Sequence, residues 1–376
     1  MSQWDDWPEK PKTNGVRGET PRHNGREARE VAKRWAIRPE GSTWGDFGED
    51  DQLGRLNLLT PEKVRQGIAE VRDGLAFCLS LPLDYPGGAV LNPTRHPPRI
   101  SPVLRDGCPC FNFPLSRVDQ RNTDVLSDDQ VTMALQYSTQ WDSLAHLGAR
   151  FDVSGTGAEE KVYYNGYRAN EHIVGPFDYR DGEDVPVEGP YGARALDVSN
   201  MARKAIQGRG VLVDLKKHFG LARHYVGYQD LQRIFELDRI VVEPGDMLVL
   251  RTGFAEVLLE MNRKPDIDVL RETASVLDGR DPALLQWVTD SGIAAICADN
   301  YAVEGVPAKE AFGKRPALPL HQHCLFKLGV PLAELWWLKD LADYLGVKAR
   351  SRFLLTAPPL YLPGAVGSPV TPVGTV

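Results

Sequence analysis

The sequence has no apolar stretch long enough to cross a bilayer and no block of basic residues. Its longest apolar runs, such as 247–250 and 293–297, fall far short of the roughly 20 residues that a transmembrane helix needs. The net charge is −7, and no Lys/Arg-rich block stands apart from neighbouring acids. This charge pattern argues against nucleic-acid binding. We therefore expect a small-molecule partner, and neither a nucleic acid nor a membrane.

Cysteine is scarce, and the N-terminus does not resemble a secretory signal. Of the five cysteines, three lie inside apolar segments and are most simply interpreted as small residues of the hydrophobic core. Cys108 and Cys110 form a C-x-C in a Pro-rich loop, which is a weak metal motif without a second pair. The first residues lack the basic flank and the apolar stretch of a signal peptide, so a cytoplasmic location is expected.

The chain contains no internal repeat and no low-complexity tract, and its 376 residues fit one large core or two fused lobes. Residues 1–41 are rich in Lys, Arg, Glu, Pro and Asn, with little apolar periodicity. They are expected to form an arm that wraps a partner subunit or stays mobile.

Beyond residue 41, the pattern of apolar residues predicts alternating helices and strands. Helices are expected at 60–72, with Thr60 as N-cap and Pro61 in the first position, and at 228–235, 281–291 and 320–328. Strands are expected at 77–81, 210–214, 247–253, 293–298 and 330–337. The segments 84–112 and 155–192 are loop-rich, and the tail from Pro358 is expected to be ordered and extended. This alternation is typical of an α/β protein.

One stretch, 136–146, gathers polar side chains directly behind an apolar run. Residues 131–135 alternate large apolar with smaller or polar side chains, which predicts a half-buried strand. Such a strand would deliver Gln136, Gln140 and Asp142 to one side. If Asp142 begins a helical turn, His146 lies on the same face four residues later, and the carboxylate can orient an imidazole that carries protons. The alternative is a strand end whose polar residues cap backbone groups.

A second set of candidate residues lies near the C-terminus. His321 and His323 belong to the helix expected before Gly329, and side chains two apart in a helix point about 200° apart. At most one of them can face a shared site. Glu334 stands among apolar neighbours, where a lone buried charge would cost several kcal/mol. It therefore needs a partner or a metal.

Several segments together resemble the metal-dependent cyclase/hydrolase family that includes bacterial kynurenine formamidase and isatin hydrolase. The resemblance covers most of the chain and is carried by Trp-Gly-Asp-Phe-Gly-Glu-Asp-Asp-Gln-Leu-Gly-Arg-Leu-Asn at 44–57, Gly-Asp-Met-Leu-Val-Leu-Arg-Thr-Gly at 245–253, Ala-Asp-Asn-Tyr-Ala-Val-Glu at 298–304 and Gly-Ser-Pro at 367–369. It implies a single mixed α/β domain of the cyclase/kynurenine formamidase type, a swivelling β/β/α fold. This catalytic domain would occupy residues 42–376, with an N-terminal arm and an extended C-terminal tail, and would associate as a homodimer or higher homo-oligomer.

The family's hallmark is His-x-Gly-Thr-His-x-Asp-x-x-x-His, in which two histidines and the aspartate bind a metal and the last histidine handles protons. On this chain the run falls on 136–146, with Gln136 and Gln140 in place of the metal-binding histidines. The resemblance therefore implies Asp142 and His146 as catalytic residues. The implied metal ligands are Gln136, Gln140, Asp142, His321 and Glu334. Because glutamine oxygen is a harder and weaker donor than imidazole, such a site favours Mn²⁺, Mg²⁺ or Ca²⁺ over Zn²⁺.

The function implied is a hydrolase that opens a C–N bond of an amide, cyclic imide or lactam, or that opens a lactone, by metal-activated water. Two alternatives stay open. One is a metal-independent cyclase, dehydratase or lyase that uses Asp142 and His146 as a dyad, and the other is a non-catalytic small-molecule-binding module. Aromatic residues predicted to line the substrate pocket are Trp44, Phe47, Trp141 and Tyr163.

Overall fold

The computed structural model describes residues 33–376, so residues 1–32 of the predicted arm lie outside the described part of the chain. Residues 34–376 form one unit of contacts. Near its beginning, Trp35 is buried and its ring meets that of Trp44 edge-on, with the ring centroids 5.8 Å apart. Among the described helices, none has the length and apolar character to traverse a lipid bilayer.

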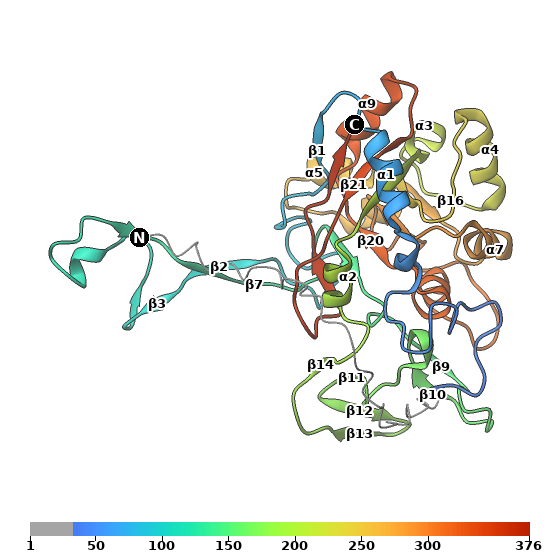
Figure 1. The fold of residues 1–376 in the computed structure, drawn as a ribbon, viewed down its shortest axis with the longest axis horizontal. Helices are drawn as coiled ribbons and strands as arrows, with labels where there is room; N and C mark the ends of the chain where they lie inside the picture. The colour runs from blue at the N-terminus through green and yellow to red at the C-terminus, as the bar shows by residue number, and fades with distance from the viewer. Residues whose placement is uncertain (1–32) are drawn as a thin grey trace, which may run out of the picture. The chain divides into compact units, whose positions relative to one another are not determined.

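A nine-stranded mixed sheet carries the fold (Figure 1). Its order is β1 (Ala76–Cys78), β23 (Val373–Thr375), β21 (Arg352–Thr356), β15 (Gln207–Asp214), β17 (Met247–Arg251), β19 (Ala295–Ala298), β20 (Leu332–Glu334), β8 (Gln140–Asp142) and β22 (Gly367–Pro369). The strands β15, β17, β19 and β20 are mutually parallel, and the flanking pairings are antiparallel. Helices connect the parallel strands, so the architecture is the mixed α/β fold that the sequence predicts.

Helices connect the strands, and some of them begin at a residue whose side chain caps the first turn. They are α1 (Pro61–Ala69), α2 (Val198–Lys204), α3 (Leu215–Phe219), α4 (Tyr228–Asp238), α5 (Phe254–Glu260), α6 (Ile267–Arg271), α7 (Pro282–Ser291), α8 (Pro319–His321) and α9 (Lys339–Val347). The Thr60 side chain accepts from the Lys63 amide, and Asp281 caps α7 in the same way. The helix α8 continues as a π-helix, η4 (Gln322–Leu328), which ends at Gly329 with φ of 61°. These caps confirm the predicted helix starts at Thr60 and Asp281 and the predicted end at Gly329, whereas α1 ends at Ala69 before the predicted Arg72 and α4 runs on to Asp238 beyond the predicted Phe235.

The central strands are buried on both faces because alternate side chains enter two different cores. One core joins Val211, Val213, Leu248, Leu250 and Ile296 to side chains of α4, α7 and η4. The other joins Leu212, Val249, Cys297 and Ala333 to side chains of α2 and α9. This double burial explains the continuous apolar runs of these strands in the sequence.

The remaining strands form two-stranded ladders outside the main sheet. They are β2 (Arg99–Pro102) with β7 (Asp129–Thr132), β3 (Leu104–Arg105) with β4 (Cys108–Pro109), β5 (Phe113–Pro114) with β6 (Val125–Leu126), β9 (Ala149–Phe151) with β10 (Glu160–Val162), β11 (Ile173–Val174) with β14 (Gly192–Ala193), β12 (Phe177–Arg180) with β13 (Glu183–Pro186), and β16 (His224–Val226) with β18 (Ser275–Leu277). The tail is ordered through β22 and β23, as predicted.

The prediction of a half-buried strand at 131–135 is wrong. Its first residues belong to β7, which pairs only with β2, and Val131 is 55% exposed. The chain then turns, and the strand that enters the main sheet is β8, beginning at Gln140. The alternating pattern gave a wrong prediction because β7 contributes to none of the hydrophobic cores found among the described residues.

Candidate active site

The strand β8 brings two polar side chains into the interior of the sheet. It runs between β20 and β22, with Gln140 opposite Glu334 in the register. Gln140 and Asp142 share one face of the strand, whereas Trp141 points to the other. The Gln140 amide donates to Glu334 Oε2 at 3.1 Å, and all three polar residues are nearly fully buried. Strand pairing alone therefore sets a carboxamide and two carboxylates side by side.

His321 enters the same region from the end of α8. Its Nδ1 lies 2.8 Å from Glu304 Oε1, and that carboxylate also accepts from two backbone N–H groups at the start of the helix. Its Nε2 faces the strand residues, 3.3 Å from Glu334 Oε1 and 3.9 Å from Asp142 Oδ2. A histidine held by a carboxylate through one ring nitrogen, with the other nitrogen directed at further ligand oxygens, is the usual arrangement of a metal ligand.

The donor set fits a divalent cation. Ligand atoms of Asp142, His321 and Glu334 all lie within 4.8 Å of one another, and donors around one ion at about 2.0–2.6 Å lie within such distances. Two buried acceptor atoms beside them, Asp142 Oδ2 and Gln140 Oε1, have no hydrogen-bond partner. An unmade buried hydrogen bond costs about 1–3 kcal/mol, and a cation would satisfy both oxygens at once.

Without a cation, the cluster is electrostatically strained. Burial raises the pKa of Asp142, and the neighbouring Glu334 carboxylate acts in the same direction. Burial lowers the pKa of His321, but the hydrogen bonds to Glu304 and Glu334 outweigh it and raise that pKa to about 10. Glu334 also loses solvation, yet the hydrogen bond from His321 holds its pKa below the usual value. The protonated imidazole of His321 thus faces three buried carboxylates, those of Asp142, Glu304 and Glu334.

His146 lies at the exposed side of this cluster, in a turn that follows β8 and not in a helix. Its side chain is 22% exposed, and its Nε2 is 3.8 Å from Asp142 Oδ1. The Gln136 amide nitrogen lies 2.7 Å from His146 Nδ1 and 3.2 Å from Asp142 Oδ1. Gln136 has room because Gly367 faces it, and a Cβ at position 367 would come within 2.4 Å of the Gln136 side chain. The structure thus brings Gln136, Asp142 and His146 together.

His323 and the four predicted pocket aromatics take other positions. His323 Nε2 lies 2.9 Å from Thr289 Oγ1, in a different environment from His321. Trp44 and Trp141 are fully buried, and each indole donates to a backbone carbonyl. Tyr163 packs against the core formed with α4 and α7, and Phe47 is half-buried. No contact recorded for these aromatics joins them to Asp142 or His146.

Sequence reasoning missed Glu304, Arg95 and Tyr301. Glu304 stood in the 298–304 motif directly after a buried strand, which was a usable signal. Arg95 donates to the backbone oxygen of Gln136 at 2.8 Å. Its charge partly offsets the rise that burial causes in the pKa of Asp142, and it adds to the effect of His321 in lowering the pKa of Glu334. Arg95 and Tyr301 line a cavity of about 10 Å³, enough for about one water molecule. Tyr301 belongs to the same 298–304 motif as Glu304, whereas the sequence around Arg95 gave no signal.

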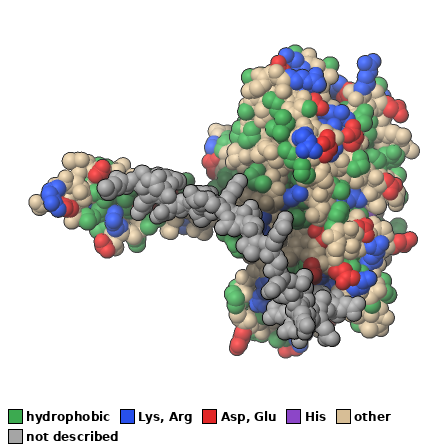
Figure 2. Space-filling model, in the orientation of Figure 1, with side chains coloured by type: hydrophobic (Ala, Val, Ile, Leu, Met, Phe, Trp, Pro, Cys, Tyr) green, Lys and Arg blue, Asp and Glu red, His purple; other side chains and the backbone are tan. Residues whose placement is uncertain are grey.

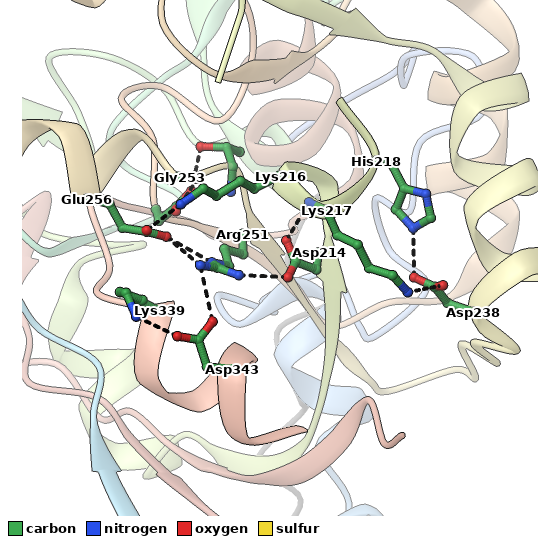
Figure 3. Close-up of polar contacts among 12 residues, drawn as sticks. Asp214, Lys216, Lys217, His218, Asp238, Arg251, Gly253, Glu256, Lys339 and Asp343 are labelled. Carbon is green, nitrogen blue, oxygen red and sulfur yellow. Dashed lines mark hydrogen bonds and ion pairs between the residues drawn. The ribbon is translucent and has the colours of Figure 1, made fainter. Parts of the chain in front are cut away.

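A second group of charges lies at the ends of β15 and β17 (Figure 3). Arg251 donates twice to Glu256 Oε1, at 2.9 and 2.8 Å, and once to Asp214 Oδ2 at 2.8 Å. Lys216 pairs with Glu256, and Arg251 also reaches Asp343, 3.4 Å away. Each carboxylate in this group faces a cation. The 245–253 motif therefore has a structural role in this part of the molecule.

Comparison with known proteins agrees with this geometry. The sequence model of the Cyclase family, described as "Putative cyclase", matches residues 79–305, more than half of the chain. The chain belongs to this family. The match includes β8, His146 and Glu304, whereas His321 and Glu334 lie beyond its end. The predicted family is confirmed.

Solved structures show the same cyclase-family fold. A crystal structure of a novel cyclase is 28% identical with a TM-score of 0.67, and the alignment covers 89% of this chain and 97% of that chain. Isatin hydrolase A from Labrenzia aggregata, bound to benzyl benzoate, is 13% identical with a TM-score of 0.50, covering 83% of this chain and 97% of that chain. No curated protein matches the sequence significantly.

Proposed function

We propose that this cyclase-family protein is a metal-dependent hydrolase that opens a C–N bond of an amide, cyclic imide or lactam, with lactones as the related ester substrates. The observation that supports it most is the convergence of Asp142, His321 and Glu334 around two unpaired buried oxygens, directly beside His146. Isatin hydrolase A, which shares the fold, is by name a hydrolase.

The residues that would hold the cation are Asp142, His321, Glu334 and Gln140, the last through its unpaired Oε1. Three of these four offer oxygen, and oxygen-rich sets suit Mn²⁺, Mg²⁺ or Ca²⁺ better than Zn²⁺. We favour Mn²⁺ because one imidazole remains in the set. When bound, such a cation polarises a carbonyl and lowers the pKa of water.

His146 is the proton carrier in this proposal. It lies at the open side of the cluster, so a substrate and an attacking water can reach its Nε2. The ring takes the proton of that water and returns it to the leaving nitrogen as the C–N bond breaks. Asp142, 3.8 Å from Nε2, stabilises the protonated ring in between.

Gln136 positions His146 in both protonation states. When Nδ1 is unprotonated, the amide nitrogen donates to it, as the observed contact allows. When Nδ1 carries a proton, the carboxamide can turn and accept through its oxygen, which leaves the Nε2 lone pair free to act as a base. A histidine bound to a metal at this position could not turn in this way.

The test is turnover of a panel of amides, cyclic imides, lactams and lactones by metal-depleted protein reloaded with Mn²⁺ or Zn²⁺, with ring-opened products identified by mass spectrometry. We expect turnover that needs the cation and that His146→Ala abolishes. His172→Ala is the matched control, because His172 lies in the 155–192 region and its recorded contacts involve none of the cluster.

Two results would contradict the proposal. Turnover that survives complete metal depletion would favour the metal-independent dyad of Asp142 and His146. Protein that retains Mn²⁺ but converts no compound of the panel would favour a binding module.

A further inference from the structure

Arg95 lies beside the candidate site without a carboxylate of its own. Its Nη1 donates to the backbone oxygen of Gln136, and the Gln136 side chain contacts His146. Figure 2 shows basic and acidic side chains close to one another over much of the face drawn. Within residues 33–376, in contrast, the guanidinium of Arg95 forms no ion pair with an Asp or Glu side chain. The positive charge of this half-buried side chain is therefore not matched locally.

One edge of the Arg95 guanidinium is unpaired. Its Nε and Nη2 have no hydrogen bond in the described chain, and neither is among the buried atoms that lack a partner, so solvent reaches both. The N–H groups of this edge are parallel and suit the two oxygens of a carboxylate. Arg209 shows the arrangement in the same protein, because its Nε and Nη2 donate to the two oxygens of Asp246 at 2.8 and 3.0 Å.

The backbone that carries Arg95 is held in a fixed turn. The Arg95 amide donates to the Asn92 carbonyl at 3.1 Å, and the Asn92 side-chain oxygen accepts from the amide and the hydroxyl of Thr94 at 3.0 and 2.7 Å. The bond from Nη1 to Gln136 restrains the other end of the side chain. Because little freedom is left to lose, binding of an anion to Arg95 costs less entropy.

The surroundings of Arg95 favour a charged contact. The same small cavity is lined by Tyr301 and by the apolar side chains of Val90, Leu91 and Leu335. Burial raises the pKa of the Tyr301 hydroxyl, so this group stays protonated at neutral pH and adds no negative charge. Apolar neighbours reduce the screening by water, and an anion beside Arg95 is therefore held more strongly than in open solvent.

A purely electrostatic role would not need the unpaired edge. Arg95 acts on Asp142 and Glu334 through its charge and forms a hydrogen bond with neither. A lysine would supply the same charge as a compact ammonium group. The planar edge of Arg95 points instead to a ligand with two coplanar oxygens.

We propose that Arg95 binds a carboxylate of the substrate, so that the preferred substrates are amides, imides or lactams that carry an acidic group in addition to the bond that breaks. This inference rests on the proposed function, in which the reacting carbonyl lies beside His146. The hydrolysis leaves the carboxylate unchanged, and the single charge of Arg95 matches that of the carboxylate. Arg95 thus determines which substrate binds and does not take part in the proton transfer.

The experiment compares the affinities of paired compounds that differ only in a carboxylate. The pairs are 5-oxoproline with 2-pyrrolidinone, succinamate with propionamide, and phthalamate with benzamide. Calorimetric titration uses the full Mn²⁺-loaded chain with His146→Ala, so that hydrolysis does not consume the ligands. Arg95→Lys is added to this background as the test. Arg105→Lys is the matched control, because Arg105 is exposed on β3 and has no recorded contact with the site.

We expect the acid of at least one pair to bind about 10–100-fold more tightly than its neutral partner, the range for hydrogen bonds to charged groups. Arg95→Lys keeps the charge but loses the two parallel donors, and should reduce this preference at least about tenfold. Arg105→Lys should keep the preference, and both variants should keep their Mn²⁺.

Three results would overturn the proposal. One is equal binding of acid and neutral partner in every pair. Another is an acid preference that survives Arg95→Lys, because the cation or another group would then bind the carboxylate. The third is loss of Mn²⁺ from Arg95→Lys, which would assign Arg95 to the cation site. Wild type that converts no compound but shows an Arg95-dependent acid preference in this titration would support the carboxylate site and contradict the proposed hydrolase.

Discussion

Two clusters of charged side chains in this protein look alike in composition but differ in balance. Around Arg251, the four carboxylates of Asp214, Asp238, Glu256 and Asp343 face Arg251 and three lysines (Figure 3). Around His321, three carboxylates share one imidazole, and two acceptor oxygens have no partner. The first cluster is complete in itself, and the second is complete only with an added positive charge. The balance between cations and carboxylates, more than the presence of charge, distinguishes a cluster that stabilises the fold from one that forms a binding site.

The largest effect is expected from Asp142→Asn, which removes a charged ligand from the unbalanced cluster. A cation at 100 times its Kd stabilises the native state by about 2.7 kcal/mol, and the variant should lose this Mn²⁺-dependent rise in the free energy of unfolding together with turnover. Denaturant titration with and without Mn²⁺ measures it. Asp343→Asn, in the balanced cluster, should keep the Mn²⁺ effect. A wild-type Mn²⁺ response in Asp142→Asn would place the cation elsewhere.

His146→Ala should lower kcat by about 10²–10⁴ while leaving Mn²⁺ binding intact, because general acid–base catalysis contributes this much. The measurement pairs steady-state kinetics with metal content of the purified variant. Loss of the metal together with activity would make His146 a ligand and not a proton carrier.

Arg251→Ala should remove the ion-pair partner of Asp214 and one of the two cations that face Glu256, which keeps Lys216. Removing one partner of a buried ion pair costs about 3–5 kcal/mol, and Arg251 is 9% exposed beside Glu256 at 10%. We expect this loss in the free energy of unfolding, with the Mn²⁺ affinity of the folded protein unchanged. A loss of Mn²⁺ affinity in the folded variant would show that the two clusters are coupled.

Glu304→Gln keeps the size of the side chain but weakens its hold on His321 Nδ1. Changes to such outer partners usually cost 10–100-fold in metal affinity. Calorimetric titration of Mn²⁺ should show this drop, whereas Glu256→Gln in the balanced cluster should not. An unchanged Mn²⁺ affinity would remove His321 from the set of ligands.

Gln140→His is expected to have the smallest effect. It should alter the preference between Zn²⁺ and Mn²⁺ and not whether a metal is bound. Imidazole favours Zn²⁺ more than a carboxamide oxygen does, so the ratio of Zn²⁺ to Mn²⁺ affinity should rise by about tenfold or less. Competition between the two ions, followed by metal analysis, measures the ratio. An unchanged ratio would mean that Gln140 does not contact the cation.

The sequence predicted the central strands and the capped helices because their signals are local. Thr60, Asp281 and Gly329 act within one turn of the chain, and the buried strands are continuous apolar runs. The site was only partly predictable. Gln136, Gln140, Asp142 and His146 are close in sequence, whereas Glu304 and Arg95 reach them through the tertiary fold. The strand before Gln136 was mispredicted because alternation alone does not tell a core-facing strand from an exposed one.

The contact between Gly367 and Gln136 links two positions that are 231 residues apart in the sequence. A side chain at 367 would need the space that the Gln136 carboxamide fills, so position 367 cannot take a larger residue while Gln136 keeps its place. Among homologous chains, the two positions should therefore covary, with a larger residue at 367 only where the side chain at 136 is shorter.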